Sequence, residues 1–141
     1  MDPMDWRLSL VGRYMHAFER GDRAALERIF SPNFHEHLRD YGEASRNEAL
    51  NHFDDMVRFT RYRNIQILAV DTEDDDEVRV SCTFRFHAAT HDWIVDVRMN
   101  LRMADRLIEY NAIEYAKVTV LERWGEESDW LKAAPAAALT E

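Results

Sequence analysis

The sequence predicts an α+β domain in which three N-terminal helices pack against one face of a curved, mainly antiparallel sheet. Apolar residues recur at helical spacing in residues 4–61, whereas residues 77–120 hold three runs that alternate apolar and polar side chains. Helices grouped before strands are typical of α+β domains. A chain of 141 residues has the size of one domain. We therefore expect one domain over residues 1–141, with its core at about 6–120 and a C-terminal segment at 121–141.

The first two helices are bounded by clear end signals. The first is expected from about Met4 to Arg20 and ends at Gly21. Asp22 is then placed to cap a short helix over residues 23–30, which the following Ser-Pro-Asn sequence should stop.

A third helix is predicted after a short strand and a loop. Residues 34–38 can form the strand, and residues 39–44 are expected to be a loop. Ser45 with Glu48 three positions later resembles a capping box, so the helix should begin there and end near Arg61.

Three long strands should form most of the sheet, after a shorter one at residues 65–70 and an acidic turn. Their alternating runs cover residues 78–88, 93–103 and 108–118, and each has one largely apolar face. The third run breaks the pattern once, because Glu114 stands where an apolar residue is expected.

Two tight turns would bring the apolar faces of these strands together. A turn at Ala89-Thr90 sets Phe84 opposite Val95, and a turn at Ala104-Asp105 sets Val95 opposite Glu114. The combined face then forms the floor of a pocket. Its expected lining residues are Phe18, Phe53, Val80, Cys82, Phe84, Phe86, Val95, Val97, Met99 and Ala112.

Glu114 is the leading catalytic candidate on this reasoning. A carboxylate among apolar neighbours loses hydration, which raises its pKa and suits it to act as a general base or acid near neutral pH. In the alternative interpretation, Glu114 pairs with an arginine, or a bulge turns it to solvent, since bulges are common in strongly curved sheets.

Three stretches of the chain resemble the nuclear transport factor 2-like superfamily. They read VGRYMHAFERGDRAALERIFSPNF, GEASRNEALNHF and LRMADRLIEYNAIEYAKV. The group includes SnoaL-like polyketide cyclases, ketosteroid isomerases and limonene epoxide hydrolases. The resemblance implies a cystatin-like, cone-shaped barrel whose helices close a pocket. It also implies that the convex face of the sheet pairs in a homodimer.

The resemblance to ketosteroid isomerases singles out Tyr14, which matches their oxyanion-donating tyrosine and could polarise a substrate carbonyl. Where those enzymes carry two catalytic aspartates, this chain has Leu38 and Met99. The alternative is that Tyr14 is a core residue of an amphipathic helix.

The strand at residues 34–38 supplies two further candidates, Glu36 and His37. Alternation puts Glu36 on one side and His35 with His37 on the other. SnoaL-like proteins often carry a histidine near the end of this strand, and His37 resembles it. If Glu36 faces inward beside Glu114, the two carboxylates share the cavity and one stays protonated. His35 and His37 could be two ligands of a zinc ion, but no third ligand stands at a spacing typical of a metal site, so we expect no metal.

Asp96 and Arg98 suggest the epoxide hydrolase branch, where charged partners activate water. Alternation places both on the outer face of the sheet, so we expect them to be solvated or buried in a dimer.

Composition and motif content disfavour several partners and cofactors. A net charge of −9 disfavours nucleic acids and anionic membranes. The single cysteine, Cys82, and the absence of an N-terminal targeting pattern favour the cytoplasm. No phosphate-binding loop or dinucleotide fingerprint is present, so we expect no cofactor.

The resulting hypothesis is a cofactor-independent, SnoaL-like enzyme that transfers protons on a small apolar molecule, carbonyl-bearing or cyclic, as an isomerase, cyclase or dehydratase. Glu114 would be the base, and Tyr14 or Tyr110 the hydrogen-bond donor. The first alternative is a noncatalytic ligand-binding or dimerisation module, favoured if Trp124 and Trp130 wall off the pocket. The second is an epoxide hydrolase-like enzyme.

Overall fold

The computed structural model describes residues 3–38 and 42–121. It contains the helices α1 (Pro3–Arg20), α2 (Arg23–Ile29) and α3 (Arg46–Phe59). The strands are β1 (Phe30–Leu38), β2 (Gly42–Ser45), β3 (Arg61–Asp71), β4 (Glu77–Ala88), β5 (His91–Ala104) and β6 (Leu107–Leu121). The predicted helix 127–134 and the two tryptophans expected near the pocket, Trp124 and Trp130, lie outside the described residues.

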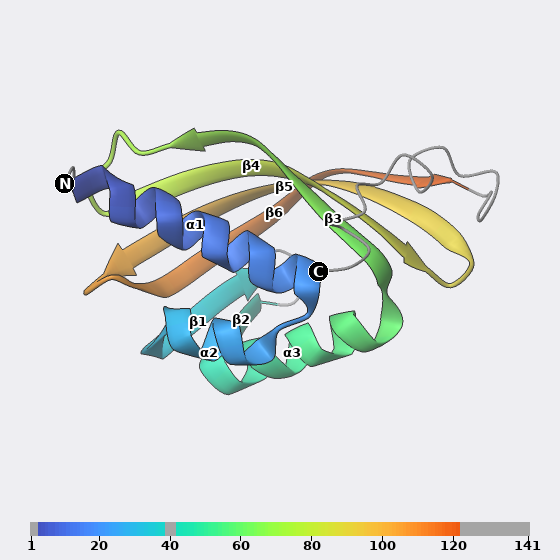
Figure 1. Ribbon diagram of the computed structural model, residues 1–141, viewed down its shortest axis with the longest axis horizontal. Coiled ribbons are helices and arrows are strands. Elements are labelled where there is room, and N and C mark those ends of the chain that lie inside the picture. Colours follow the sequence, from blue (N-terminus) through green and yellow to red (C-terminus); the bar gives the residue numbers. More distant parts are fainter. Residues whose placement is uncertain (1–2, 39–41, 122–141) are drawn as a thin grey trace.

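Within the described residues, one mixed sheet has the strand order β2-β1-β6-β5-β4-β3. Strands β1 and β6 run parallel, and the other neighbours are antiparallel. Helix α1 crosses one face of the curved sheet, while α2 and α3 lie beside β1 and β2 (Figure 1). The core fills the space between the helices and the inner face of the sheet. The predicted α+β cone is therefore confirmed.

The end signals of the helices act as predicted. The Asp22 side chain accepts a hydrogen bond from the Ala25 amide at 3.1 Å. At the start of α3, Ser45 and Glu48 form both hydrogen bonds of a capping box. Gly21 has a φ of +67°, and an added Cβ would lie 3.0 Å from the Arg63 guanidinium, so glycine fits this break best.

A buried arginine connects α1 with the acidic turn between β3 and β4, a contact that the sequence does not predict. Arg7 is 4% exposed. Its guanidinium donates to the carbonyl oxygens of Thr72, Asp74 and Asp75 at 3.1, 2.7 and 3.2 Å. These bonds fix one end of α1 against the β3–β4 connection.

Two local predictions in the N-terminal half are wrong. The Ser-Pro-Asn sequence does not precede the strand but lies inside β1, whose register against β6 shifts between Phe30 and His35. Part of the predicted loop 39–44 instead forms β2, which pairs with β1. The short polar sequence of β2 carries little strand signal, and its pairing with β1 supplies the stabilisation.

The hairpin of β4 and β5 has the predicted register. Ala89 and Thr90 form its turn, with φ values of 53° and 68°, and Phe84 lies opposite Val95. Positive φ at both positions is the geometry of a type I′ turn, which matches the twist of the flanking strands.

The hairpin of β5 and β6 departs from the prediction, and the difference decides what enters the pocket. Its turn is Asp105-Arg106, and β6 carries one extra residue, Glu109, between the partners of Met103 and Arg102. An extra residue moves every following side chain to the opposite face. Glu114 consequently lies opposite Arg98, and its predicted pairing with Val95 is wrong.

A second irregularity between Asp96 and Val97 restores the original phase near the end of β6. Val97 pairs with Tyr115, and Val95 pairs with Val118. The inner face of β6 therefore presents Asn111, Ile113, Tyr115 and Val118. Among the described residues, no helix has the length and apolar character needed to cross a bilayer.

Candidate functional site

A largely apolar cavity of about 510 Å³ lies between the helices and the inner face of the sheet. Seven of the ten expected lining residues form its wall: Phe18, Phe53, Phe84, Phe86, Val95, Val97 and Met99. The wall also includes Tyr14, Leu26, Phe30, Glu36, Leu38, Ala49, His52, Met56, Trp93, Ile113, Tyr115 and Val118. Such a volume suits a small organic molecule.

The other three expected lining residues lie elsewhere. Val80 and Cys82 are each 1% exposed and belong to the hydrophobic core, not to the cavity wall. Ala112 lies on the outer face, because the bulge at Glu109 reverses the alternation of β6.

Glu36 is the carboxyl group inside this cavity. Alternation along β1 turns Phe34, Glu36 and Leu38 inward, and Glu36 is only 6% exposed. Burial raises the pKa of its carboxyl to about 7, since the charged form loses hydration. At neutral pH this group is divided between its acid and base forms, which is the condition for moving protons in either direction.

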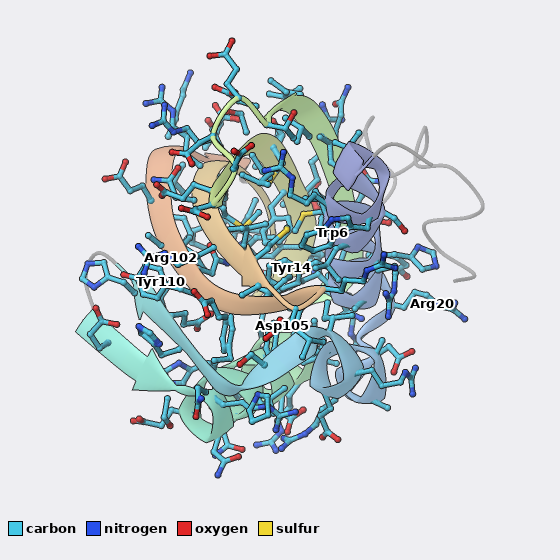
Figure 2. The ribbon with its side chains drawn as sticks, turned by 90° about the vertical axis from the view of Figure 1, so that its left-hand side faces the viewer. Trp6, Tyr14, Arg20, Arg102, Asp105 and Tyr110 are labelled. Atoms are coloured by element: carbon cyan, nitrogen blue, oxygen red, sulfur yellow. The ribbon has the colours of Figure 1, made fainter. Side chains whose placement is uncertain are left out.

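Tyr14 lies beside Glu36 and is fully buried. Its pKa is raised well above the ordinary value, first by burial and then by the negative charge of Glu36. The Tyr14 hydroxyl oxygen accepts a hydrogen bond from Asn111 Nδ2 at 2.8 Å. Figure 2 shows Tyr14 directed from α1 towards the interior of the sheet.

The remaining catalytic candidates do not face the cavity. Glu114 is exposed on the outer face opposite Arg98, so its expected position in the pocket is wrong, and the bulge is the reason. Tyr110 is also on the outer face, where Arg102 lies 5.7 Å from its ring centre (Figure 2).

His37 likewise points away from the cavity. Its Nδ1 lies 3.5 Å from a carboxylate oxygen of Glu43, and its side chain is 42% exposed. The alternation along β1 that turns Glu36 inward turns His37 outward.

Asp96 and Arg98 lie on the outer face, as their alternation predicts. Asp96 accepts a hydrogen bond from the Thr83 hydroxyl at 3.0 Å, and Arg98 is exposed. The inward orientation on which the epoxide hydrolase hypothesis depended is not found.

The described residues contain no cluster of three or more His, Cys, Asp or Glu side chains that could hold a metal ion. Burial, with the charge of Asp96, raises the pKa of the Cys82 thiol to about 11. Because the thiolate is the reactive form, Cys82 is a poor nucleophile at neutral pH.

Asn111 and Tyr115 are site residues that sequence reasoning missed. The predicted alternation puts Asn111 on the polar face of the last strand, because Tyr110 and Ala112 continue its apolar face. Ile113 and Tyr115 supply an alternative apolar alternation over the same residues, and that is the signal that the strand could change phase. His52, an exposed residue of α3, also reaches the cavity wall.

No protein-family profile matches the chain, and no curated protein matches it by sequence. Solved structures do match its fold. SalBIII, an epoxide hydrolase/cyclase-like enzyme in pyran ring formation in polyether salinomycin, has a TM-score of 0.74 at 14% identity, covering 85% of this chain and 99% of that one.

Two further structures extend the comparison. A putative SnoaL-like polyketide cyclase from Jannaschia sp. has a TM-score of 0.72 at 12% identity, covering 82% of this chain and 90% of that one. A ketosteroid isomerase-like hypothetical protein from Catenulispora acidiphila, in complex with trimethylamine, has a TM-score of 0.67 at 14% identity, covering 75% and 84%.

The fold and the cavity define an α+β cone with an internal, largely apolar cavity. More particularly, the chain has the nuclear transport factor 2-like fold, with structural neighbours that include SnoaL-like, ketosteroid isomerase-like and epoxide hydrolase-like proteins.

Proposed function

We propose that this protein is a cofactor-independent enzyme that transfers protons on a small, apolar molecule that carries a carbonyl group or a ring. The observation that carries the proposal is Glu36, a carboxyl group with a pKa of about 7 in a cavity that is otherwise largely apolar. Isomerisation, cyclisation and dehydration are all reactions that such a group can support.

In the proposed mechanism, ionised Glu36 removes a proton from a carbon atom next to a substrate carbonyl. Tyr14 donates a hydrogen bond to the carbonyl oxygen, where negative charge develops as the proton leaves. Protonated Glu36 then returns the proton to a different atom. The aromatic wall keeps water from the charged intermediate, so the tyrosine hydrogen bond is stronger than it would be in solution.

Deuterium exchange into a probe ketone tests this proposal without knowledge of the natural substrate. β-Tetralone is a two-ring apolar ketone with acidic protons beside its carbonyl, and proton NMR in deuterium oxide follows their loss. We expect the wild-type exchange rate to rise as pH increases through about 7, because the base form of Glu36 is the active one.

Glu36→Gln should lower the exchange rate by about 100-fold or more, the usual contribution of a positioned general base. Glu114→Gln is the matched control, since it removes an exposed carboxyl on the outer face. Equal exchange by wild type and Glu36→Gln would refute the proposed base.

A noncatalytic ligand-binding module is the second candidate. It is favoured by Leu38 and Met99, which stand at the positions matched to the two catalytic aspartates of ketosteroid isomerases and both line the cavity. The same exchange experiment separates the two functions, because a binding module would take up β-tetralone in a titration without accelerating exchange.

We also propose that the outer face of the sheet forms a homodimer and that the protein acts in the cytoplasm. The dimer is supported by the resemblance to the nuclear transport factor 2-like superfamily, and the cytoplasm by the buried Cys82, which is a free thiol. Light scattering of the purified protein should give the mass of two chains, whereas the mass of one chain would contradict the dimer.

A further inference from the structure

The bulge in β6 turns a polar side chain, Asn111, inward against Tyr14 of the cavity wall, which regular pairing would not do. Asn111 is 0% exposed, and its Nδ2 lies 2.8 Å from the Tyr14 hydroxyl oxygen and 3.5 Å from Met99 Sδ. Its Oδ1 has no hydrogen-bond partner among the described residues. An unpaired carbonyl oxygen is unfavourable when it is buried. Its presence here indicates that the Asn111 amide has a role beyond packing.

The contact with Met99 determines which way the amide faces. A thioether sulfur accepts hydrogen bonds but cannot donate them. The Asn111 atom that faces both Met99 Sδ and Tyr14 must therefore be the nitrogen, since an oxygen there would meet an acceptor on the sulfur side. Rotating the amide by half a turn would also leave two unpaired N–H groups in place of one unpaired oxygen.

The direction of this hydrogen bond fixes the remaining role of the Tyr14 hydroxyl. Because its oxygen accepts from Asn111, its own proton is left for another acceptor. No described residue accepts that proton within hydrogen-bond distance. The packed rings of Phe18 and Phe30, at 5.1 and 5.7 Å between ring centres, also restrict the phenol ring.

We infer that Asn111 is a positioning residue: its amide donates to Tyr14 and so directs the phenol proton into the cavity, towards a carbonyl oxygen of the ligand. This inference rests on the proposed function, since it assigns the Tyr14 proton to the atom where charge develops. The acceptor must be a carbonyl or similar oxygen, because only an acceptor group completes the chain from Asn111 through Tyr14. The ligand is thereby defined as an apolar molecule with an oxygen acceptor at the Tyr14 end of the cavity.

Infrared spectroscopy of bound β-tetralone, carbon-13 labelled at its carbonyl, tests the direction of the proton. A hydrogen bond from Tyr14 lowers the carbonyl stretching frequency. We expect the band to move to higher wavenumber in Tyr14→Phe, and to move in the same direction in Asn111→Leu and Asn111→Ala. Asn111→Leu keeps a similar volume, whereas Asn111→Ala removes the amide without adding bulk.

Thr83→Val is the control, because it removes another buried hydrogen bond that lies on the outer face. Its bound ketone should keep the wild-type band. In deuterium exchange, Asn111→Leu should lower kcat by about tenfold with KM little changed, less than the ~100-fold expected for Tyr14→Phe.

Two results would overturn the inference. If Tyr14→Phe has the wild-type band, the phenol proton does not face the ligand. If both Asn111 variants have the wild-type band while Tyr14→Phe does not, Asn111 does not direct the proton. Both results are band positions of the bound ketone and do not depend on turnover. A failure of Glu36 as the base would instead appear as an unchanged exchange rate in Glu36→Gln, so the two failures are distinguishable.

Discussion

Replacing Glu36 with glutamine should remove a large part of the dependence of stability on pH. The wild-type carboxyl has a pKa of about 7 when folded, against an ordinary value of 4.5. The folded state therefore binds more protons than the unfolded state between these two values, so the free energy of unfolding falls as pH rises. The contribution is complete below about pH 4.5 and is lost as pH rises through about 7.

The size of the effect follows from the difference between the two pKa values. A difference of about 2.5 pH units, at about 1.36 kcal/mol per unit, corresponds to about 3 kcal/mol. Roughly 2.5 kcal/mol of this falls between about pH 5 and pH 8.5. No discount for solvent is needed, because Glu36 is 6% exposed.

Urea unfolding of wild type, Glu36→Gln and the control Glu114→Gln at these two pH values measures the effect. Wild type and Glu114→Gln should lose about 2.5 kcal/mol more than Glu36→Gln as pH rises. The comparison between variants cancels the titration of all other groups. An equal pH dependence in wild type and Glu36→Gln would refute the argument that burial has tuned this carboxyl.

Three further changes test the fold around the site. Deletion of Glu109 should leave cooperative unfolding intact, followed by circular dichroism, because Tyr110 would then follow Ile108 in a regular ladder and Asn111 would still pair with Leu101; a deletion that abolishes cooperative unfolding, while the point substitution Glu109→Ala does not, would contradict the assignment of Glu109 as the extra residue. Ser45→Ala should cost about 1 kcal/mol in urea unfolding, since it removes the cap of α3, whereas no loss relative to the exposed Ser9→Ala would count against the capping box. Leu50→Ala, at a side chain 1% exposed, should cost about 3 kcal/mol, and a loss below ~1 kcal/mol would show that this part of the core is loosely packed.

The elements of this fold were predictable because their signals are local. Alternation identified β4 and β5, and the Ala89-Thr90 turn then fixed their register. The caps at Asp22 and Ser45 marked two helix starts. Each of these features depends on residues close together in the sequence, so no knowledge of the tertiary structure was needed.

The site was only partly predictable, because one extra residue, Glu109, decides which side chains of β6 face inward. Alternation along β1 placed Glu36 on the side opposite His37 but did not say which side is the inner one. A bulge at Glu109 is not marked by glycine or proline, and both phases of residues 110–115 contain apolar side chains. The choice between them is made by packing across the sheet, where Asn111 reaches Tyr14 from 97 positions away in the chain. Local periodicity therefore selected Glu114, whereas the tertiary structure buries Glu36.

The most direct test of the central claim is the titration of Glu36 by NMR. Carbon-13 labelling of glutamate side-chain carboxyls, with Glu36→Gln to assign the resonance, gives the pKa of this one group in the folded protein. We expect a midpoint near 7 for Glu36. A midpoint near the ordinary 4.5 would contradict it, because the carboxyl would then be fully ionised at neutral pH and would hold protons too weakly to return them to a substrate.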